Sequence, residues 1–144
     1  MIWKFALILF AIVGISHLIF GIVYVTANEF MTYHAQALNV DWNSLNENYK
    51  TLFLALIRLA GVGGLVAGLV NVTLVSYLYH CVESRLIWLL IASSLIFQLM
   101  INSAVYSVYV NTSGDPPVLM VSVGSVTLII AIILLLAGFR GKHA

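Results

Sequence analysis

Four long apolar segments constrain this chain more than any other feature of its sequence. They span about residues 5–25, 52–79, 86–110 and 118–139. Each exceeds the roughly 20 residues that a helix needs to cross about 30 Å of hydrocarbon. They lack the alternation of polar and apolar residues that marks a transmembrane barrel, so helices remain the way to satisfy the backbone in lipid. The sequence therefore predicts an all-α polytopic membrane protein, a bundle of four transmembrane helices.

The composition favours a single membrane domain over residues 1–144. Hydrophobic residues make up 62% of the chain and charged residues 8%, whereas a soluble domain carries about 25% charged residues. The net charge is +1 without a long basic run, so we expect no nucleic-acid partner. One cysteine, Cys81, excludes an intrachain disulfide. Segment 5–25 follows Lys4 as a signal peptide would, but it is longer than the usual apolar stretch of about 7–15 residues, so we expect a retained span.

Basic residues predict the orientation through the positive-inside rule. Those on one side of the four spans are Lys4, Arg85, Arg140 and Lys142. Lys50 lies on the other side, in the long loop 26–51, which also carries acidic residues. We therefore predict that both termini are cytoplasmic, that loop 26–51 faces outward, and that the membrane is a bacterial inner or cell membrane.

Loop 26–51 carries an amphipathic pattern. Apolar side chains recur at helical spacing at Phe30, Tyr33, Ala37 and Leu38. Aromatic-rich segments of this kind lie at the membrane interface, so we predict an interfacial helical segment in this first outer loop. Asp41 or Ser44 is expected to cap a short helix that leads into the second span.

Two interpretations of this loop remain open. It could be a lid over the outer mouth of the bundle, with His34 and Trp42 contacting a ligand, or an anchor that only covers the helix ends. Met31-x-x-His34 offers two ligands for a soft metal. Two ligands do not make a site, so no metal is predicted there.

Polar side chains within the spans fall at similar depth. The ionisable ones are His17 and Arg58, and a charge inside the membrane costs about 2.5–3.5 kcal/mol on insertion scales. With a rise of about 1.5 Å per residue, all four spans place a polar side chain in the outer half of the membrane, namely His17, Arg58, Asn102 and Ser125, with Gln98 just below. Arg58 needs acceptors, which its polar neighbours can supply.

This predicted layer also has two interpretations. In the structural one, Arg58 reaches the outer interface and the other polar groups hold the helices together. In the functional one, Arg58 and His17 form an anion or headgroup site open to the outside, with the carbonyl of a quinone or lipid as a third partner. The candidate ligand-binding residues are Arg58, His17, Asn102, Gln98, Ser125, His34 and Trp42.

The second span contains small residues at regular spacing. Ala60, Gly64 and Gly68 fall four apart on one helix face, the small-xxx-small pattern that lets helix backbones approach closely. The pattern predicts helix packing, which would place the second span centrally or at a dimer contact.

Motifs for common enzyme chemistries are absent from the sequence, including nucleotide-binding glycine loops, zinc-peptidase motifs and the nucleophile elbow. His17 has no second histidine at its depth, so haem held by two histidines is not expected. We predict no cofactor, no metal site and no catalytic residue.

Arg58-x-x-Gly61 opens the glycine-rich second span of a four-span chain. In this layout the chain resembles the DoxX-like group of small bacterial four-helix membrane proteins. The resemblance implies a four-helix fold and, as for some members, a link to membrane redox systems. The loop with Tyr33-His34 and Trp42 has no counterpart that we match to this group, and the resemblance assigns no functional residues.

We expect a small binding or accessory protein, alone or as a subunit of a larger membrane complex. Its outward-facing polar pocket would take a membrane lipid, a quinone or a partner helix. One alternative is a small transporter or channel, which would require a homo-oligomer because four spans rarely enclose a pore. A second is a lipid- or quinone-modifying enzyme with His17 as its base.

Overall fold

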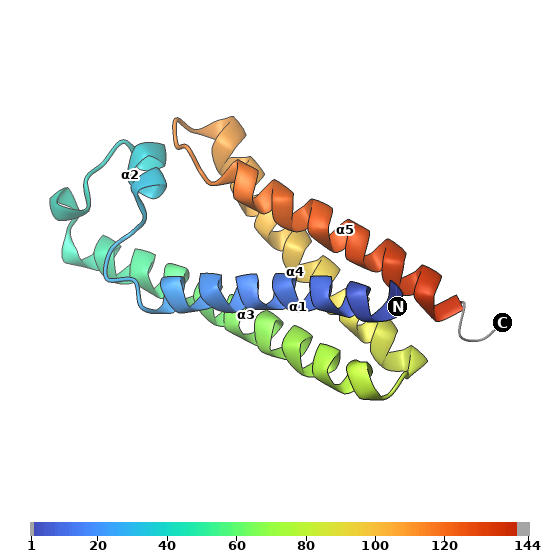
Figure 1. Cartoon of the computed structure of the whole chain (residues 1–144). Helices are drawn as coiled ribbons and strands as arrows, with labels where there is room; N and C mark the ends of the chain where they lie inside the picture. Colours follow the sequence, from blue (N-terminus) through green and yellow to red (C-terminus); the bar gives the residue numbers. More distant parts are fainter. Residues whose placement is uncertain (1, 141–144) are drawn as a thin grey trace.

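Four helices that are long and apolar enough to cross a membrane dominate the computed structural model, which describes residues 2–140. The elements in chain order are α1 (Ile2–Val25), α2 (Thr32–Leu38), the 3₁₀ helix η1 (Trp42–Ser44), α3 (Glu47–His80), α4 (Ser84–Asn111) and α5 (Val118–Arg140) (Figure 1). No strand occurs in this part of the chain. The predicted all-helical fold with four membrane-spanning helices is confirmed.

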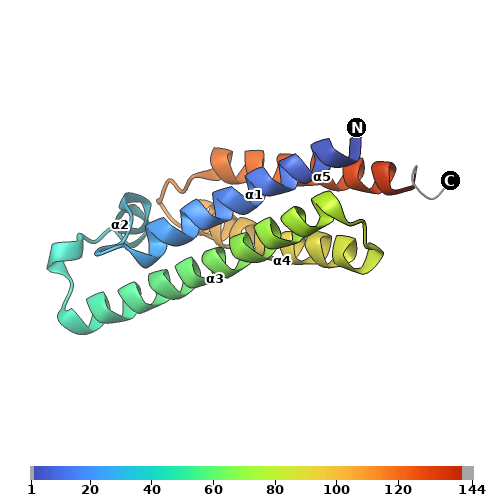
Figure 2. The same ribbon diagram turned by 60° about the horizontal axis from the view of Figure 1, so that its bottom comes forward.

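The four long helices form a ring in which α1 contacts α3 and α5, and α4 contacts the same two helices from the opposite side. The start of α1, the end of α5 and the turn between α3 and α4 lie at one end of the bundle (Figures 1 and 2). We call this the terminal end. The opposite end carries residues 26–46 and 112–117, and we call it the loop end.

The core fills the terminal half of the bundle. Its buried side chains come from all four long helices and include Leu7, Phe10, Leu78, Leu90 and Leu135. Here α3 and α4 are held together by their short connection at residues 81–83. Toward the loop end, α4 and α5 diverge from α1 and α3, and α2 lies between the two pairs (Figure 1).

Glycines bring α1 and α3 into close contact. A Cβ atom on Gly21 would lie 2.6 Å from the backbone nitrogen of Leu65, and one on Gly68 would lie 2.7 Å from the carbonyl oxygen of Gly14. Gly64 also faces α1, where a Cβ would lie 3.1 Å from the carbonyl oxygen of His17. Only glycine permits this approach between backbones.

The observed stripe differs from the predicted one at its first position. Gly61 contacts α1, where its Cβ would lie 2.9 Å from the carbonyl oxygen of Gly21, whereas Ala60 is exposed on a neighbouring face of α3. Gly64 and Gly68 lie in the stripe itself. The glycine stripe of α3 therefore packs against α1 of the same chain.

The chain between α1 and α3 contains a short helix, as its amphipathic pattern predicts, and then the η1 turn. α2 ends at Asn39, which adopts a left-handed conformation with φ 51°, a conformation that asparagine tolerates better than most residues. The cap of α3 is Asn46, whose Oδ1 accepts from the backbone nitrogen of Tyr49 at 3.0 Å. As predicted, Asp41 stands at the N-cap position of a short helix, η1, that leads into α3, although its side chain makes no cap hydrogen bond, and Ser44 is the last residue of η1.

Candidate functional site

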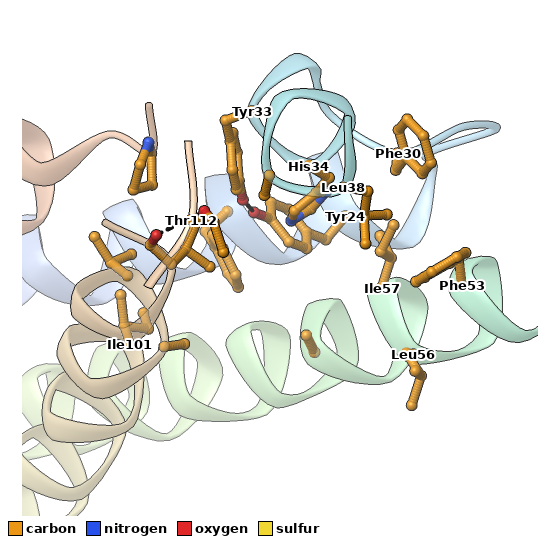
Figure 3. A pocket seen from close by; sticks show the side chains of 17 residues that line it. Tyr24, Phe30, Tyr33, His34, Leu38, Phe53, Leu56, Ile57, Ile101 and Thr112 are labelled. Carbon is orange, nitrogen blue, oxygen red and sulfur yellow. Dashed lines mark hydrogen bonds between the residues drawn. The ribbon is translucent and has the colours of Figure 1, made fainter. Parts of the chain in front are cut away.

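A cavity of about 470 Å³ lies at the loop end of the bundle. α1, α3 and α4 form its walls and α2 its roof (Figure 3). The volume is within the range of about 300–1,000 Å³ that is typical of small-molecule sites. Its lining is almost wholly apolar and comprises Phe20, Tyr24, Phe30, Tyr33, His34, Ala37, Leu38, Phe53, Leu56, Ile57, Ala60, Ile101, Ala104, Val105, Val108, Thr112 and Pro116.

Part of the cavity lining is exposed on the side of the bundle where α3 and α4 lie. Leu56 and Ala60 of α3 and Ala104 of α4 line it and are also exposed on the surface of the bundle. These residues belong to helices that diverge toward the loop end (Figure 1). Both helices are long and apolar enough to cross a membrane.

Hydrogen bonds on two sides hold the roof helix α2 in place. The hydroxyl of Tyr33 on α2 bonds to the hydroxyl of Tyr24 on α1. On the other side, Ser113 donates from Oγ to the carbonyl oxygen of Gln36 at 2.8 Å, and the backbone nitrogen of Asp115 donates to the Gln36 side chain at 3.2 Å. A seven-residue helix is too short to be stable alone, so these bonds fix its position.

An aromatic cluster joins α2 to the start of α3. Phe30 is buried, and its ring centroid lies 5.0 Å from that of Trp42, 6.0 Å from that of Phe53 and 6.5 Å from that of His34, all edge to face. Such pairs each contribute about 0.5–1.5 kcal/mol. Trp42, a predicted ligand contact, thus packs on Phe30 behind the cavity, whereas His34 lines the cavity itself.

His34 is held in one tautomer. The backbone N–H of Met31 donates to its Nδ1 at 3.2 Å, so the neutral ring carries its proton on Nε2. Burial lowers the pKa of His34, and burial raises the pKa of Tyr33, with a further contribution from its bond to Tyr24. The roof of the cavity is therefore uncharged at neutral pH.

Docking of α2 is expected to weaken in acid. Protonated His34 cannot accept the Met31 N–H, and its lowered pKa means that the released segment binds a proton more tightly than the docked one. The contribution of His34 to docking is therefore fully present above the ordinary histidine pKa of about 6.5 and is lost as the pH falls from there through the lowered pKa of the docked form. The protection factors of the amides of residues 32–38 against hydrogen exchange, at a series of pH values, measure this docking. In the His34→Gln variant these protection factors should no longer fall in acid, and a fall as large as in the unmodified protein would contradict the assignment.

A polar cluster lies at the centre of the bundle, where Gln98 of α4 contacts side chains from α1 and α5. Its Oε1 lies 3.4 Å from Nε2 of His17, and its Nε2 donates to Oγ of Ser125 at 3.0 Å and to Oδ1 of Asn102 at 3.4 Å. Ser125 also donates to Asn102 at 3.1 Å. These four predicted residues are thus brought together, and His17 is only 4% exposed.

The polar cluster lies about one helical turn from the cavity. Phe20 and Ile101, which line the cavity, follow His17 and Gln98 by three residues on α1 and α4. Nδ1 of His17 is buried and has no hydrogen-bond partner in the described part of the chain. The cluster therefore lies between the apolar cavity and the core of the terminal half.

Arg58 lies outside this cluster. Its side chain is exposed, and Nη2 donates to the carbonyl oxygen of Ala27, just after α1, at 3.3 Å. Its neighbour Ile57 and the next-turn residue Gly61 face the interior, so Arg58 points away from it. Matched depth did not bring Arg58 to His17, because depth along a helix does not determine the direction in which a side chain points.

The sequence interpretation did not identify Tyr24 and most of the cavity wall. Phe20 and Tyr24 are four residues apart and share a helix face, a pattern that could have indicated an aromatic wall. The sequence contains no such pattern at Ile57, Ala104 and Val108, because apolar side chains are expected both on lipid-facing surfaces and in apolar cavities.

Comparison with known protein families, curated proteins and solved structures gives no match to this chain. The resemblance to DoxX-like proteins therefore stays a prediction. The cavity under α2 and the polar cluster beside it are the features on which a function can be proposed for this membrane protein.

Proposed function

We propose that this protein is a small membrane binding or accessory protein that takes up a lipid-soluble molecule in the cavity under α2. The observation that carries the proposal is an apolar cavity of about 470 Å³ whose lining includes exposed residues of two helices that are long and apolar enough to cross a membrane. A molecule dissolved in the bilayer could enter sideways without crossing water. Because lipid tails are as apolar as the cavity wall, affinity would come from close packing and from the polar groups of the roof.

We propose further that the loop end faces outward and that both termini are cytoplasmic. Lys4 and Arg85 lie at the terminal end of the bundle, where α1 and α4 begin, and basic residues favour the cytoplasmic side. In a bacterial cell membrane, the cavity would then open to the outer leaflet.

The packing of the terminal half supports binding over transport. Phe10, Leu78, Leu90 and Leu135 are fully buried there, and interiors packed in this way leave few voids larger than water. A transported molecule would need a path through this core.

The proposal is tested by filling the cavity. Ala60→Phe adds a ring to the cavity wall on α3, whereas Ala55→Phe adds the same ring to an exposed site on the same helix outside the cavity. Overpacking costs about 1–3 kcal/mol, so we expect Ala60→Phe to lower retention of the ligand roughly tenfold. Organic extracts of protein purified in mild detergent, analysed by mass spectrometry, measure the retained molecule.

The control should retain as much as the unmodified protein. Equal retention by both variants, or no stoichiometric lipid-soluble molecule in any sample, would count against the proposed function.

A further inference from the structure

The polar groups of the cavity are concentrated in its roof. Tyr24, Tyr33 and His34 lie close together there (Figure 3), with ring centroids of Tyr33 and His34 4.1 Å apart. The other polar side chain, Thr112, already donates its hydroxyl hydrogen to the carbonyl oxygen of Val108 at 2.7 Å. The tyrosine pair and the imidazole are therefore the groups left to bind the polar end of a ligand.

Two hydrogens in this roof lack a protein acceptor. In the Tyr24–Tyr33 bond one hydroxyl donates and the other accepts, so the accepting hydroxyl keeps a hydrogen of its own. In His34 the Nδ1 atom accepts from Met31, so Nε2–H is the second donor. Neither hydrogen has another protein partner within residues 2–139.

The cavity also lacks charge. Within the described part of the chain, its lining contains no lysine, arginine, aspartate or glutamate, and Arg58 is exposed and bonded to the Ala27 carbonyl. Burying an ionised group in such a place is very costly without a partner of opposite charge. The ligand's polar end must then be uncharged.

We propose that the ligand is an uncharged amphiphile whose polar end is a carbonyl oxygen, held by the free hydroxyl hydrogen of the Tyr24–Tyr33 pair and by Nε2–H of His34. A carbonyl oxygen has two lone pairs and can accept both hydrogens at once. This inference rests on the proposed function, since it specifies the ligand of the same cavity. Ester-linked lipids and quinones share this chemistry.

An alcohol fits the roof less well. Its oxygen could accept the same two hydrogens, but its own hydroxyl hydrogen would then face an apolar wall. An unsatisfied buried donor costs about 1–3 kcal/mol. The roof therefore favours a ketone or ester over an alcohol with the same chain.

The experiment compares three probes of equal chain length, a methyl ketone, the matching secondary alcohol and the matching carboxylate. Their equilibrium binding to the full chain in detergent micelles is measured near pH 7.5. We expect the ketone to bind at least about fivefold more tightly than the alcohol, with the carboxylate weakest. A long-chain methyl ester and an alkylated benzoquinone, measured in the same way, distinguish the two sources of the carbonyl.

The variant Tyr24→Phe/Tyr33→Phe should remove most of the preference for ketone over alcohol, because it deletes the pair's free hydrogen and keeps both rings in the cavity lining. The variant also deletes the bond between α1 and α2, so binding of the alcohol, which should be retained, shows that the roof is still in place. The control is Tyr49→Phe/Tyr106→Phe, which changes two exposed tyrosines outside the cavity and should keep the preference. A ratio of affinities does not depend on the fraction of folded protein.

The outcomes separate the two proposals. Equal binding of ketone and alcohol to the unmodified protein, with both abolished by Ala60→Phe, overturns the carbonyl inference and leaves the proposed function standing. Tighter binding of the carboxylate also overturns it. If no probe binds, or if Ala60→Phe changes nothing, the proposed function fails and the inference fails with it.

Discussion

Gly21→Ala is expected to destabilise the protein by about 2–3 kcal/mol, although alanine is a better helix former than glycine. The added Cβ would lie 2.6 Å from the backbone nitrogen of Leu65 and 2.8 Å from the carbonyl oxygen of Gly61. Backbone atoms of a helix cannot rotate away as a side chain can, so α1 must move away from α3. Because α1 also carries much of the core, this movement would loosen the whole bundle.

Gly63→Ala is the matched control on α3. Its Cβ would meet only Cε2 of Phe97, at an ordinary contact distance of 3.6 Å. We expect no destabilisation and a gain of up to about 1 kcal/mol from helix propensity. Thermal unfolding in detergent, followed by circular dichroism, measures both variants. Similar unfolding temperatures for the two would show that the close α1–α3 contact does not govern stability.

Gln98→Leu is expected to lower the free energy of unfolding by about 2–3 kcal/mol. Leucine has a similar size, so the change removes hydrogen bonds without leaving a large cavity. The side chain of Gln98 bonds to His17 and to Ser125. Without it, both ring nitrogens of His17 would be buried without a partner, since Nδ1 already lacks one in the described residues.

A double variant separates lost hydrogen bonds from lost packing. Replacing both partners of a buried bond by apolar groups is far less costly than removing one. His17→Phe/Gln98→Leu should therefore be more stable than the sum of the two single changes predicts, by roughly 1 kcal/mol. If the changes in the free energy of unfolding, measured by equilibrium denaturant titration, are strictly additive, the polar cluster is not cooperative.

Part of the polar cluster could be predicted from depth alone. His17, Gln98, Asn102 and Ser125 were placed near one level by counting residues from the span ends, and the structure joins them by hydrogen bonds. Arg58 was counted to the same level, yet it faces outward and bonds to Ala27. Residue counting reports distance along a helix axis, whereas a contact also requires the right rotation about it.

The sequence by itself determined the four membrane-spanning helices and the short helix in the first loop. The reason is that lipid and the interface impose strong and different demands on side chains, so hydropathy and helical spacing carry this information. Gly64 and Gly68 could also be assigned to helix packing, because small residues repeated on one face of a membrane-spanning helix allow a neighbouring helix backbone to approach closely. The predicted position Ala60 lines the cavity instead.

Only the tertiary structure decided where the cavity lies and which groups form its roof. An apolar residue such as Ala104 is equally compatible with a lipid-facing surface, a packed core and a cavity wall. The sequence therefore does not indicate which of these three environments it occupies. The Tyr24–Tyr33 bond joins α1 to α2, and the contacts of Gln36 with Ser113 and Asp115 join α2 to the α4–α5 turn. The cavity arises because two helix pairs diverge under this fixed roof, and that divergence depends on packing between segments far apart in the chain.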